Sequence, residues 1–321
     1  MLTQQLKLLI AYDGTACADA ALDDLRRAGL PGEVEALVVF VEESSRLPEV
    51  ASYEVVDGVL CEISAHPEMV SAHSHSLSLA TIGAERIRKS FPLWKVRAES
   101  VKGSAARAIL GRAEEWPPDL ITVGSHGRSA LGRVVLGSVS QKVLRKAQTS
   151  VRVARRSEAG RQSIRIVIGV DGSLSSLAAV REVARRIWPP HSEVLVLAVE
   201  DPLVPTAVGS LIPPLTNRVK EQNPSEGEWL KKVLDNSVAD LRAAGMTASL
   251  SVVTGDPKHV LVDEAKRFKA DTIFVGSVGF SNRVERLLLG SVSAAVSARS
   301  HCTVEVVRPK KMNLIVPTPV G

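Results

Sequence analysis

The stretch Val123–Ser140, VGSHGRSALGRVVLGSVS, decides the fold, because it predicts the end of a strand, a glycine-rich loop and the start of a helix. The run before it, Leu120–Val123, is short, apolar and partly β-branched, which is typical of a buried strand. A helix that starts at Ser138 presents free N–H groups and the positive end of its dipole, which suit an anion. The loop carries glycines that allow a ligand to approach the backbone closely, namely Gly124, Gly127 and Gly137. These features together predict a cradle for a phosphate group.

The spacing of this cradle differs from that of the common phosphate-binding motifs. Neither GxxxxGK[ST] nor GxGxxG occurs in the chain. The pattern is G-x2-G-x9-G-S, formed by Gly124, Gly127, Gly137 and Ser138. It resembles the motif of the universal stress proteins, whose ATP-binding members carry G-x2-G-x9-G-(S/T). A tight strand-to-helix turn without a ligand is the alternative interpretation of the same residues.

The chain also repeats itself, which predicts two similar units. Asp13-Gly14 returns as Asp171-Gly172, and the glycine motif returns as Gly276, Gly279, Gly290 and Ser291. The second motif has one more residue between its middle and last glycines, and Val278 stands where the first copy has His126. A longer loop is expected to displace the N–H groups of Gly290 and Ser291 from the phosphates, so nucleotide binding at the second site is open.

Each copy alternates apolar strands with helices, which predicts an α/β fold of two tandem doubly wound, Rossmann-like domains with parallel sheets covered on both faces. The expected domains are residues 1–156 and 164–309, with a linker at 157–163 and a tail at 310–321. The expected strands are 6–12, 34–41, 94–101, 119–124 and 150–155, then 164–170, 193–199, 248–253, 271–276 and 303–308. The expected helices are 16–29, 68–90, 104–115 and 138–147, then 174–187, 226–244, 257–268 and 291–299. Residues 44–67 are expected to be irregular.

Composition narrows the class of protein. The chain has 321 residues, enough for about two domains, and 45 % of them are hydrophobic, enough for sizeable cores. The net charge of +5 lies largely around the linker, so it does not predict nucleic-acid binding. Three scattered cysteines form no disulfide framework and indicate a reducing compartment. No signal peptide or membrane helix is evident, so the expected location is the cytoplasm.

The resemblance assigns ligand roles to residues at the carboxyl ends of the strands, where open α/β sheets bind ligands. It implies that Asp13 and Val41 contact the adenine, through side chain and backbone respectively. For Asp13, a helix N-cap role is the alternative. It implies that the ribose and phosphates meet Val123, Gly124, Gly127, Gly137, Ser138 and Val139. The second copy offers Asp171, Val199, Gly276, Gly279, Gly290, Ser291 and Val292.

The loop between these residues also carries His126, Arg128 and Arg133, which contact phosphates or simply form the loop. Cys61, His66, His73 and His75 fit no common zinc spacing, so no metal site is predicted. No catalytic motif occurs, and no base is evident to position a water on a γ-phosphate. The chain is therefore not expected to be an enzyme.

The favoured hypothesis is a regulatory, stress-response protein that binds ATP, with Mg²⁺ carried on the nucleotide and little or no hydrolysis. The alternatives are a scaffold of the same fold with an empty pocket and, last, a nucleotide-using enzyme such as an adenylyl transferase. The resemblance further implies pairing of domains through their fifth strands. Here Val151–Arg155 and Val304–Arg308 would form a pseudo-dimer within one chain, and a further homo-oligomer is possible.

Overall fold

The structure is a computed structural model, and the residues that it describes fall into eight ranges. These ranges are 5–42, 53–56, 59–62, 67–126, 136–156, 162–200, 224–279 and 289–309. The described residues up to 156 are called the first half below, and those from 162 onward the second half. Within the described ranges, no helix is both long and apolar enough to cross a membrane.

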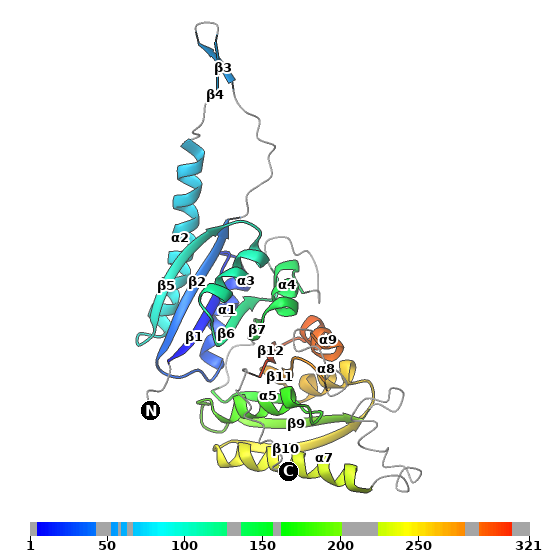
Figure 1. Cartoon of the computed structure of the whole chain (residues 1–321). Helices are drawn as coiled ribbons and strands as arrows, with labels where there is room; N and C mark the ends of the chain where they lie inside the picture. Colours follow the sequence, from blue (N-terminus) through cyan, green and yellow to red (C-terminus); the bar gives the residue numbers. More distant parts are fainter. Residues whose placement is uncertain are drawn as a thin grey trace, which may run out of the picture.

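Ten strands form one continuous sheet in the order β10-β9-β8-β11-β12-β7-β6-β1-β2-β5. Each half contributes five strands that pair in parallel, and the two sets join where β7 pairs antiparallel with β12 (Figure 1). The strands of the first half are β1 Leu6–Ala11, β2 Val34–Glu42, β5 Lys95–Lys102, β6 Leu120–Gly124 and β7 Ser150–Ala154. Those of the second are β8 Arg165–Gly169, β9 Glu193–Glu200, β10 Thr247–Thr254, β11 Thr272–Gly276 and β12 Thr303–Val307.

Helices cover both faces of this sheet, as the apolar strands require. In the first half they are α1 Ala16–Asp24, the 3₁₀ turn η1 Leu25–Arg27, α2 Pro67–Ser90, α3 Ala105–Glu115 and α4 Ser138–Lys146. In the second they are α5 Leu174–Ala184, α7 Pro224–Ala243, α8 Pro257–Arg267 and α9 Ser291–Arg299. The chain is thus an α/β protein of tandem Rossmann-like units.

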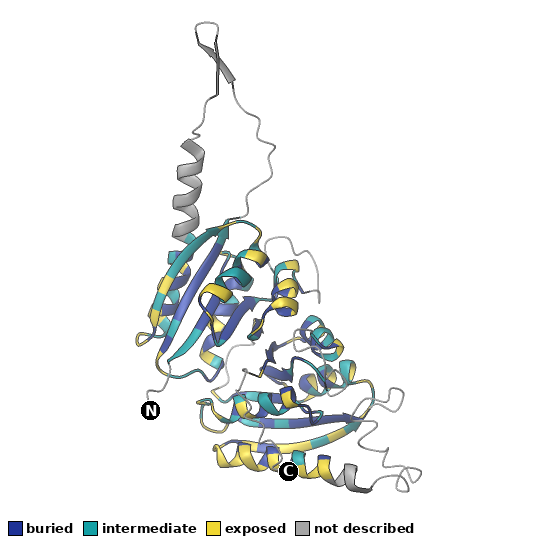
Figure 2. Ribbon diagram, viewed as in Figure 1, coloured by how far each residue is buried: buried dark blue, intermediate teal, exposed yellow. Residues whose placement is uncertain are grey.

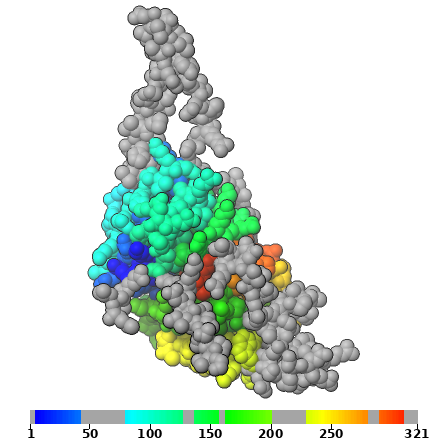
Figure 3. Space-filling view, in the orientation of Figure 1, coloured from blue at the N-terminus to red at the C-terminus, as the bar shows by residue number. Residues whose placement is uncertain are grey.

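One hydrophobic core runs across the junction of the halves. Leu9, Ile121 and Val143 of the first half belong to the same buried cluster as Val167 and Val296 of the second. The opposite face has a separate core in each half. The central strands are almost entirely buried (Figure 2), and the segment near residue 300 lies at the boundary between the halves in the space-filling view (Figure 3).

The predicted elements are found, with three differences. A short antiparallel hairpin, β3 Tyr53–Val56 and β4 Val59–Glu62, lies in the segment that was expected to be irregular. The first helix ends at Asp24, not near residue 29, because the chain tightens into η1 and then takes a positive φ of 63° at Gly29. Helix α5 also ends early, at Ala184. Most of the expected linker and the expected tail lie outside the described residues.

Candidate functional site

The first candidate site lies at the carboxyl edge of the sheet, where β1 and β6 are neighbours. Asp13 follows β1, and its Oδ1 accepts hydrogen bonds from the Thr15 backbone N–H (3.0 Å) and hydroxyl (2.6 Å). Thr15 Oγ1 in turn accepts from the N–H of Ala18 at 3.2 Å and caps α1. The N-cap interpretation of Asp13 is therefore wrong, because Thr15 is the cap and Asp13 holds it in place.

The second half repeats this arrangement. Asp171 Oδ1 accepts from the N–H of Ser173 at 3.0 Å, and Ser173 Oγ accepts from the N–H of Ser176 at 3.1 Å as the cap of α5. Gly14 and Gly172, which follow the two aspartates, have φ of 75° and 77°, values that glycine adopts without strain. Both aspartates are thus fixed by the same turn beside the end of a central strand.

Val41 and Val199 present backbone groups to the same edge. The last bond between β1 and β2 on this side joins the N–H of Tyr12 to the carbonyl of Val39 at 2.9 Å. Because backbone groups alternate sides along a strand, the N–H and C=O of Val41 point the same way as those of Val39, beyond the end of β1. The Val170 N–H bond to Leu197, also 2.9 Å, leaves Val199 in the equivalent place. These positions suit recognition of a planar base by backbone groups.

The glycine motif of the first half is anchored at both of its ends. The N–H of Ser125 donates to the carbonyl of Ala154 at 3.1 Å, and the N–H of Gly137 donates to the carbonyl of Ser125 at 2.8 Å. Ser140 Oγ donates to the carbonyl of Gly124 at 2.6 Å. The start of α4 is thereby held directly over the end of β6.

Helix α4 begins without a side-chain cap. Gly137 is the N-cap residue, with φ −59° and ψ 150°, and no side chain in the described part of the chain caps the first N–H groups of the helix. By contrast, α1 and α5 are capped by Thr15 and Ser173. An uncapped helix start leaves N–H donors and a positive dipole end, which together favour an anion. The φ of Gly137 is open to any residue, so the backbone conformation does not itself require glycine there.

The second motif has the same anchors in spite of its longer loop. The N–H of Ser277 donates to Val307 at 2.9 Å, and the N–H of Gly290 donates to Ser277 at 2.7 Å. Ser293 Oγ donates to the carbonyl of Gly276 at 2.6 Å. Gly290 caps α9 with φ −63° and ψ 152° and no side-chain bond. Both ends of the longer loop are thus fixed to strand ends as in the first half, and the displacement of the helix start from a phosphate stays a prediction.

Glycines also allow α1 and α5 to pack close to the cradles. A Cβ on Gly124 would lie 3.0 Å from the carbonyl oxygen of Cys17 in α1. A Cβ on Gly276 would lie 2.6 Å from the N–H nitrogen of Ser176 in α5. Neither position has room for a side chain. The first glycine of each motif thus serves the packing of helix on strand, which brings the capped aspartate turn next to the cradle.

Comparison with known proteins agrees with this geometry. The model of the universal stress protein family matches residues 6–155 and again residues 164–308. The chain belongs to the universal stress protein family. It is a tandem, two-domain member, since the family match occurs once in each half.

Similar proteins share this description. A universal stress protein of Mycolicibacterium smegmatis is 30 % identical over 217 residues, which cover 67 % of this chain and 69 % of that protein. The universal stress protein YxiE of Bacillus subtilis is 28 % identical over 149 residues, 45 % of this chain and 98 % of its own length. The crystal structure of a universal stress protein from Archaeoglobus fulgidus has a TM-score of 0.64 at 18 % identity, covering 95 % of this chain and 99 % of that chain. This last likeness shows the fold.

The two universal stress units differ where the glycine loop begins. In the second, the hydroxyls of Ser173 and Ser175 both donate to the carbonyl of Val278. A Cβ on Gly279 would lie 3.0 Å from Asp171 Oδ2, so the loop start rests on the aspartate turn. In the first unit, His126 instead pairs its Nδ1 with Ser125 Oγ at 3.1 Å, and its buried Nε2 has no hydrogen-bond partner among the described residues. The first site therefore retains a buried polar atom that pairs with none of the described residues.

Burial also changes the acidity of two groups near the sites. It raises the pKa of Tyr12 to about 12, and the hydrogen bond from its hydroxyl to Asp19 Oδ1 (2.8 Å) adds to the increase. Burial likewise raises the pKa of Glu200, which follows Val199 and has an Oε1 atom without a partner among the described residues. Both groups therefore resist ionisation more than they would in water.

Several site residues were missed in the sequence. Thr15 and Ser173 carry the caps, and Ser140 and Ser293 tie each helix to its strand. Ser140 and Ser293 could have been found from the sequence, because each is the last residue of a repeated G-S-V-S segment. Trp229 of α7 is 41 % exposed and lies 3.1 Å from the Cβ position of Gly172, beside the second aspartate. No pattern in the sequence indicated that contact.

Some predicted residues remain untested. Gly127, Arg128 and Arg133 lie outside the described residues, as do His66 and the side chains of Cys61, His73 and His75. Among the residues whose side chains are described, no cluster of three or more His, Cys, Asp or Glu residues is placed to hold a metal ion.

Proposed function

We propose that this universal stress protein binds ATP or another adenine nucleotide in its first half and uses it as a regulatory ligand. The base would lie between Asp13 and the backbone of Val41. The phosphates would meet Gly124, Gly127 and the start of α4 at Gly137, Ser138 and Val139, next to Val123. Mg²⁺ would arrive on the triphosphate.

The observation that carries the proposal is the uncapped start of α4, which hydrogen bonds fix over the end of β6. A helix start that no side chain satisfies stabilises a phosphate through its N–H groups and dipole. The buried, unpartnered Nε2 of His126 adds one further group able to meet that ligand.

The second site is proposed to bind more weakly. Its helix start, Gly290, Ser291 and Val292, is anchored like the first, and Gly276 and Val199 are in equivalent places. However, the two serine hydroxyls hold the Val278 carbonyl near Asp171, and Gly279 lies against that carboxylate. The aspartate is thus already partly covered by protein. This observation favours a structural role for the second half, within a pseudo-dimer that the paired fifth strands would form in one chain.

In the proposed role, the nucleotide acts as a regulatory ligand and is not a substrate that the protein turns over. The proposal is ligand binding with little or no hydrolysis, because the sequence carries no catalytic motif and no evident base to position a water on a γ-phosphate. The proposed units are residues 1–156 and 164–309, acting in the cytoplasm in a stress response.

The test is denaturing release of nucleotide from the purified protein, with identification and counting by chromatography and mass spectrometry. The expected result is about one adenine nucleotide per chain, or uptake of about one ATP·Mg²⁺ when the protein is purified empty. Gly137→Val is expected to abolish first-site binding, because a branched side chain would obstruct the phosphate. Gly32→Val is the matched control, since nothing lies within 4 Å of its Cβ position and it is far from the carboxyl edge of the sheet. Binding that survives in a folded Gly137→Val variant would refute the cradle.

A further inference from the structure

The centre of the contact between the halves is an approximate twofold axis that passes between Arg152 and Glu305. In the antiparallel pair of β7 and β12, Arg152 is directly opposite Glu305, with Val151 opposite Val306 and Val153 opposite Val304. Arg152 and Glu305 are also equivalent positions in the two repeats, SVRVAR and TVEVVR. A pairing of two identical halves in this register would therefore place each of these residues opposite itself.

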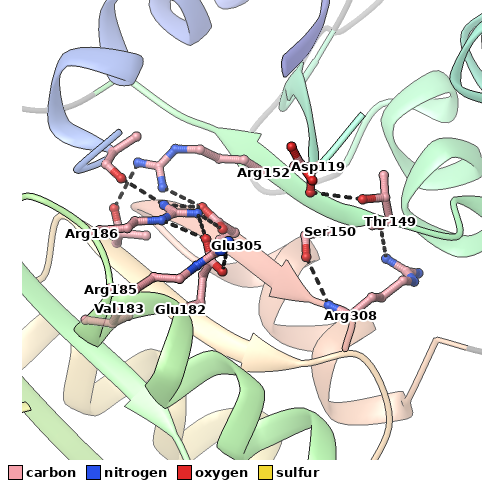
Figure 4. Close-up of polar contacts among 12 residues, drawn as sticks. Asp119, Thr149, Ser150, Arg152, Glu182, Val183, Arg185, Arg186, Glu305 and Arg308 are labelled. Carbon is pink, nitrogen blue, oxygen red and sulfur yellow. Dashed lines mark hydrogen bonds and ion pairs between the residues drawn. The ribbon is translucent and has the colours of Figure 1, made fainter. Parts of the chain in front are cut away.

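The two central residues are completely buried and belong to one network of charges (Figure 4). Arg152 donates through Nε to Asp24 Oδ2 at 2.6 Å and through Nη1 to Glu305 Oε2 at 3.0 Å. Its Nη2 donates to Thr272 Oγ1 at 3.2 Å. Every arm of the guanidinium is thus satisfied, and two of the three acceptors come from the second half.

Glu305 is held from its own half by Arg186. The Nη1 atom of Arg186 lies 3.0 Å from Glu305 Oε2, and its Nη2 donates to Glu305 Oε1 and to Glu182 Oε1. Although burial lowers the pKa of Arg186, the carboxylates of Glu305 and Glu182 more than offset this and raise it above the ordinary value. Arg186 also donates to the carbonyl of Ala28 in the first half at 2.8 Å.

Other contacts at the junction obey the twofold symmetry and would survive in a pair of identical halves. Arg308 donates to the backbone carbonyls of Thr149 at 3.2 Å and Leu144 at 2.6 Å. Its repeat equivalent, Arg155, donates to the carbonyl of Cys302 at 3.4 Å and to that of Ser297. Because both halves offer such carbonyls, these arginines stabilise the junction but do not discriminate between a like half and an unlike half.

The central network does not obey the symmetry. A pair of first halves would bring two buried guanidiniums together, and Leu120 stands where the second half offers Thr272 to Arg152. A pair of second halves would bring two Glu305 carboxylates together. Like charges directly opposite each other on paired strands destabilise the sheet. A buried charge that has lost its partner is more destabilising still.

We propose that the Arg152–Glu305 pair, with Asp24 and Arg186 behind it, makes the fifth-strand surface of each half selective for the other half and against a copy of itself. The partner that this surface takes is therefore the other half of a tandem chain, and pairing of like halves between chains is disfavoured. This selection does not depend on whether nucleotide is bound.

The experiment uses the full chain and isotope mixing. Heavy, ¹⁵N-labelled chains and light chains are unfolded together, refolded and treated with an amine-reactive cross-linker. Mass spectrometry then counts cross-links that join a first-half lysine of a heavy chain to a first-half lysine of a light chain, and the same for second halves. Chains refolded separately and then mixed give the background from any native oligomer.

The informative variant is Arg152→Gln/Glu305→Gln, which removes both central charges but keeps amide groups able to bond to Asp24 and Arg186. We expect heavy–light cross-links between like halves to rise about tenfold over wild type, which corresponds to about 1.4 kcal/mol of lost discrimination. The matched control is Arg308→Gln, which removes a buried arginine from the same junction but from a symmetric contact. Arg308→Gln is expected to lower the unfolding midpoint without increasing the heavy–light cross-links between like halves.

Two results would overturn the proposal. One is a double variant that folds, by circular dichroism and calorimetry, and shows like-half cross-links only at the wild-type level. The other is an equal rise in Arg308→Gln, which would mean that any weakening of the junction has this effect. If the double variant does not fold, Glu305→Gln alone gives the same comparison for pairs of second halves, because it preserves shape and hydrogen-bonding capacity.

Discussion

Replacement of Gly276 by alanine tests whether the second cradle depends on the close approach of α5 to the end of β11. The new Cβ would lie 2.6 Å from the amide nitrogen of Ser176 and 2.7 Å from the carbonyl carbon of Ser175. Both are backbone atoms, so relief requires movement of the helix itself. At Gly124 the nearest atom is the carbonyl oxygen of Cys17 at 3.0 Å, which is a milder overlap.

The size of the effect follows from these distances. Overpacking in a well-packed interior, which forces side chains and backbone to shift, costs about 1–3 kcal/mol. We therefore expect a loss of about 3 kcal/mol for Gly276→Ala and about 1 kcal/mol for Gly124→Ala. At about 2–4 °C per kcal/mol for units of this size, the unfolding midpoint would fall by about 6–12 °C and about 2–4 °C respectively.

The assay is differential scanning calorimetry, combined with the count of bound nucleotide. Gly111→Ala in α3 is the matched control, because nothing lies within 4 Å of its Cβ position and alanine is favoured over glycine inside a helix by about 0.5–1 kcal/mol. The same substitution should thus stabilise at Gly111 and destabilise at Gly276. A Gly276→Ala variant that melts within about 1 °C of wild type would refute the close-packing argument.

Three further predictions concern charge, titration and the second site. Arg152→Ala should lower the free energy of unfolding by about 3–5 kcal/mol in urea denaturation, because it removes the cation that pairs with the buried Asp24 carboxylate. Absorbance titration should find Tyr12 ionising near pH 12, and Asp19→Asn should lower that pKa. Since the folded pKa of about 12 exceeds the ordinary value of 10.0, stability that is present below pH 10 should decline as the pH rises from about 10 to 12. Trp229→Ala should remove any fluorescence change on nucleotide binding at the second site and leave binding at the first unaltered.

Strand and helix positions were largely predictable because their signals are local. Runs such as Arg165–Gly169 are apolar at nearly every position, which only a sheet covered on both faces accommodates. The glycine motif predicted where α4 and α9 begin, and both helices start at the serine after the last glycine. The hairpin β3–β4 was not predicted, since short strands between prolines carry little periodic signal.

The site was predictable in outline but not in its bonds. The aspartates and glycines were identified from the family resemblance and their repetition, yet the cap belongs to Thr15, two residues after Asp13, because Asp13 accepts a hydrogen bond from that hydroxyl. Whether the longer second loop displaces the start of α9 from a phosphate stays a prediction. The length of this loop is a local property, whereas the start of α9 is fixed by hydrogen bonds from Gly290 to Ser277 and from Ser293 to Gly276 at the end of β11.

The sequence by itself determined the α/β class, the tandem repeat and the glycine motifs, because each is written in neighbouring residues and their spacing. Only the tertiary structure decided how the two halves meet. Arg152, Asp24 and Glu305 are far apart in the chain, and nothing near any one of them indicates that it is buried with the others. A buried charge is stable only with its partners in place, so its role exists only once the folded sheet has brought β7, β12 and α1 together.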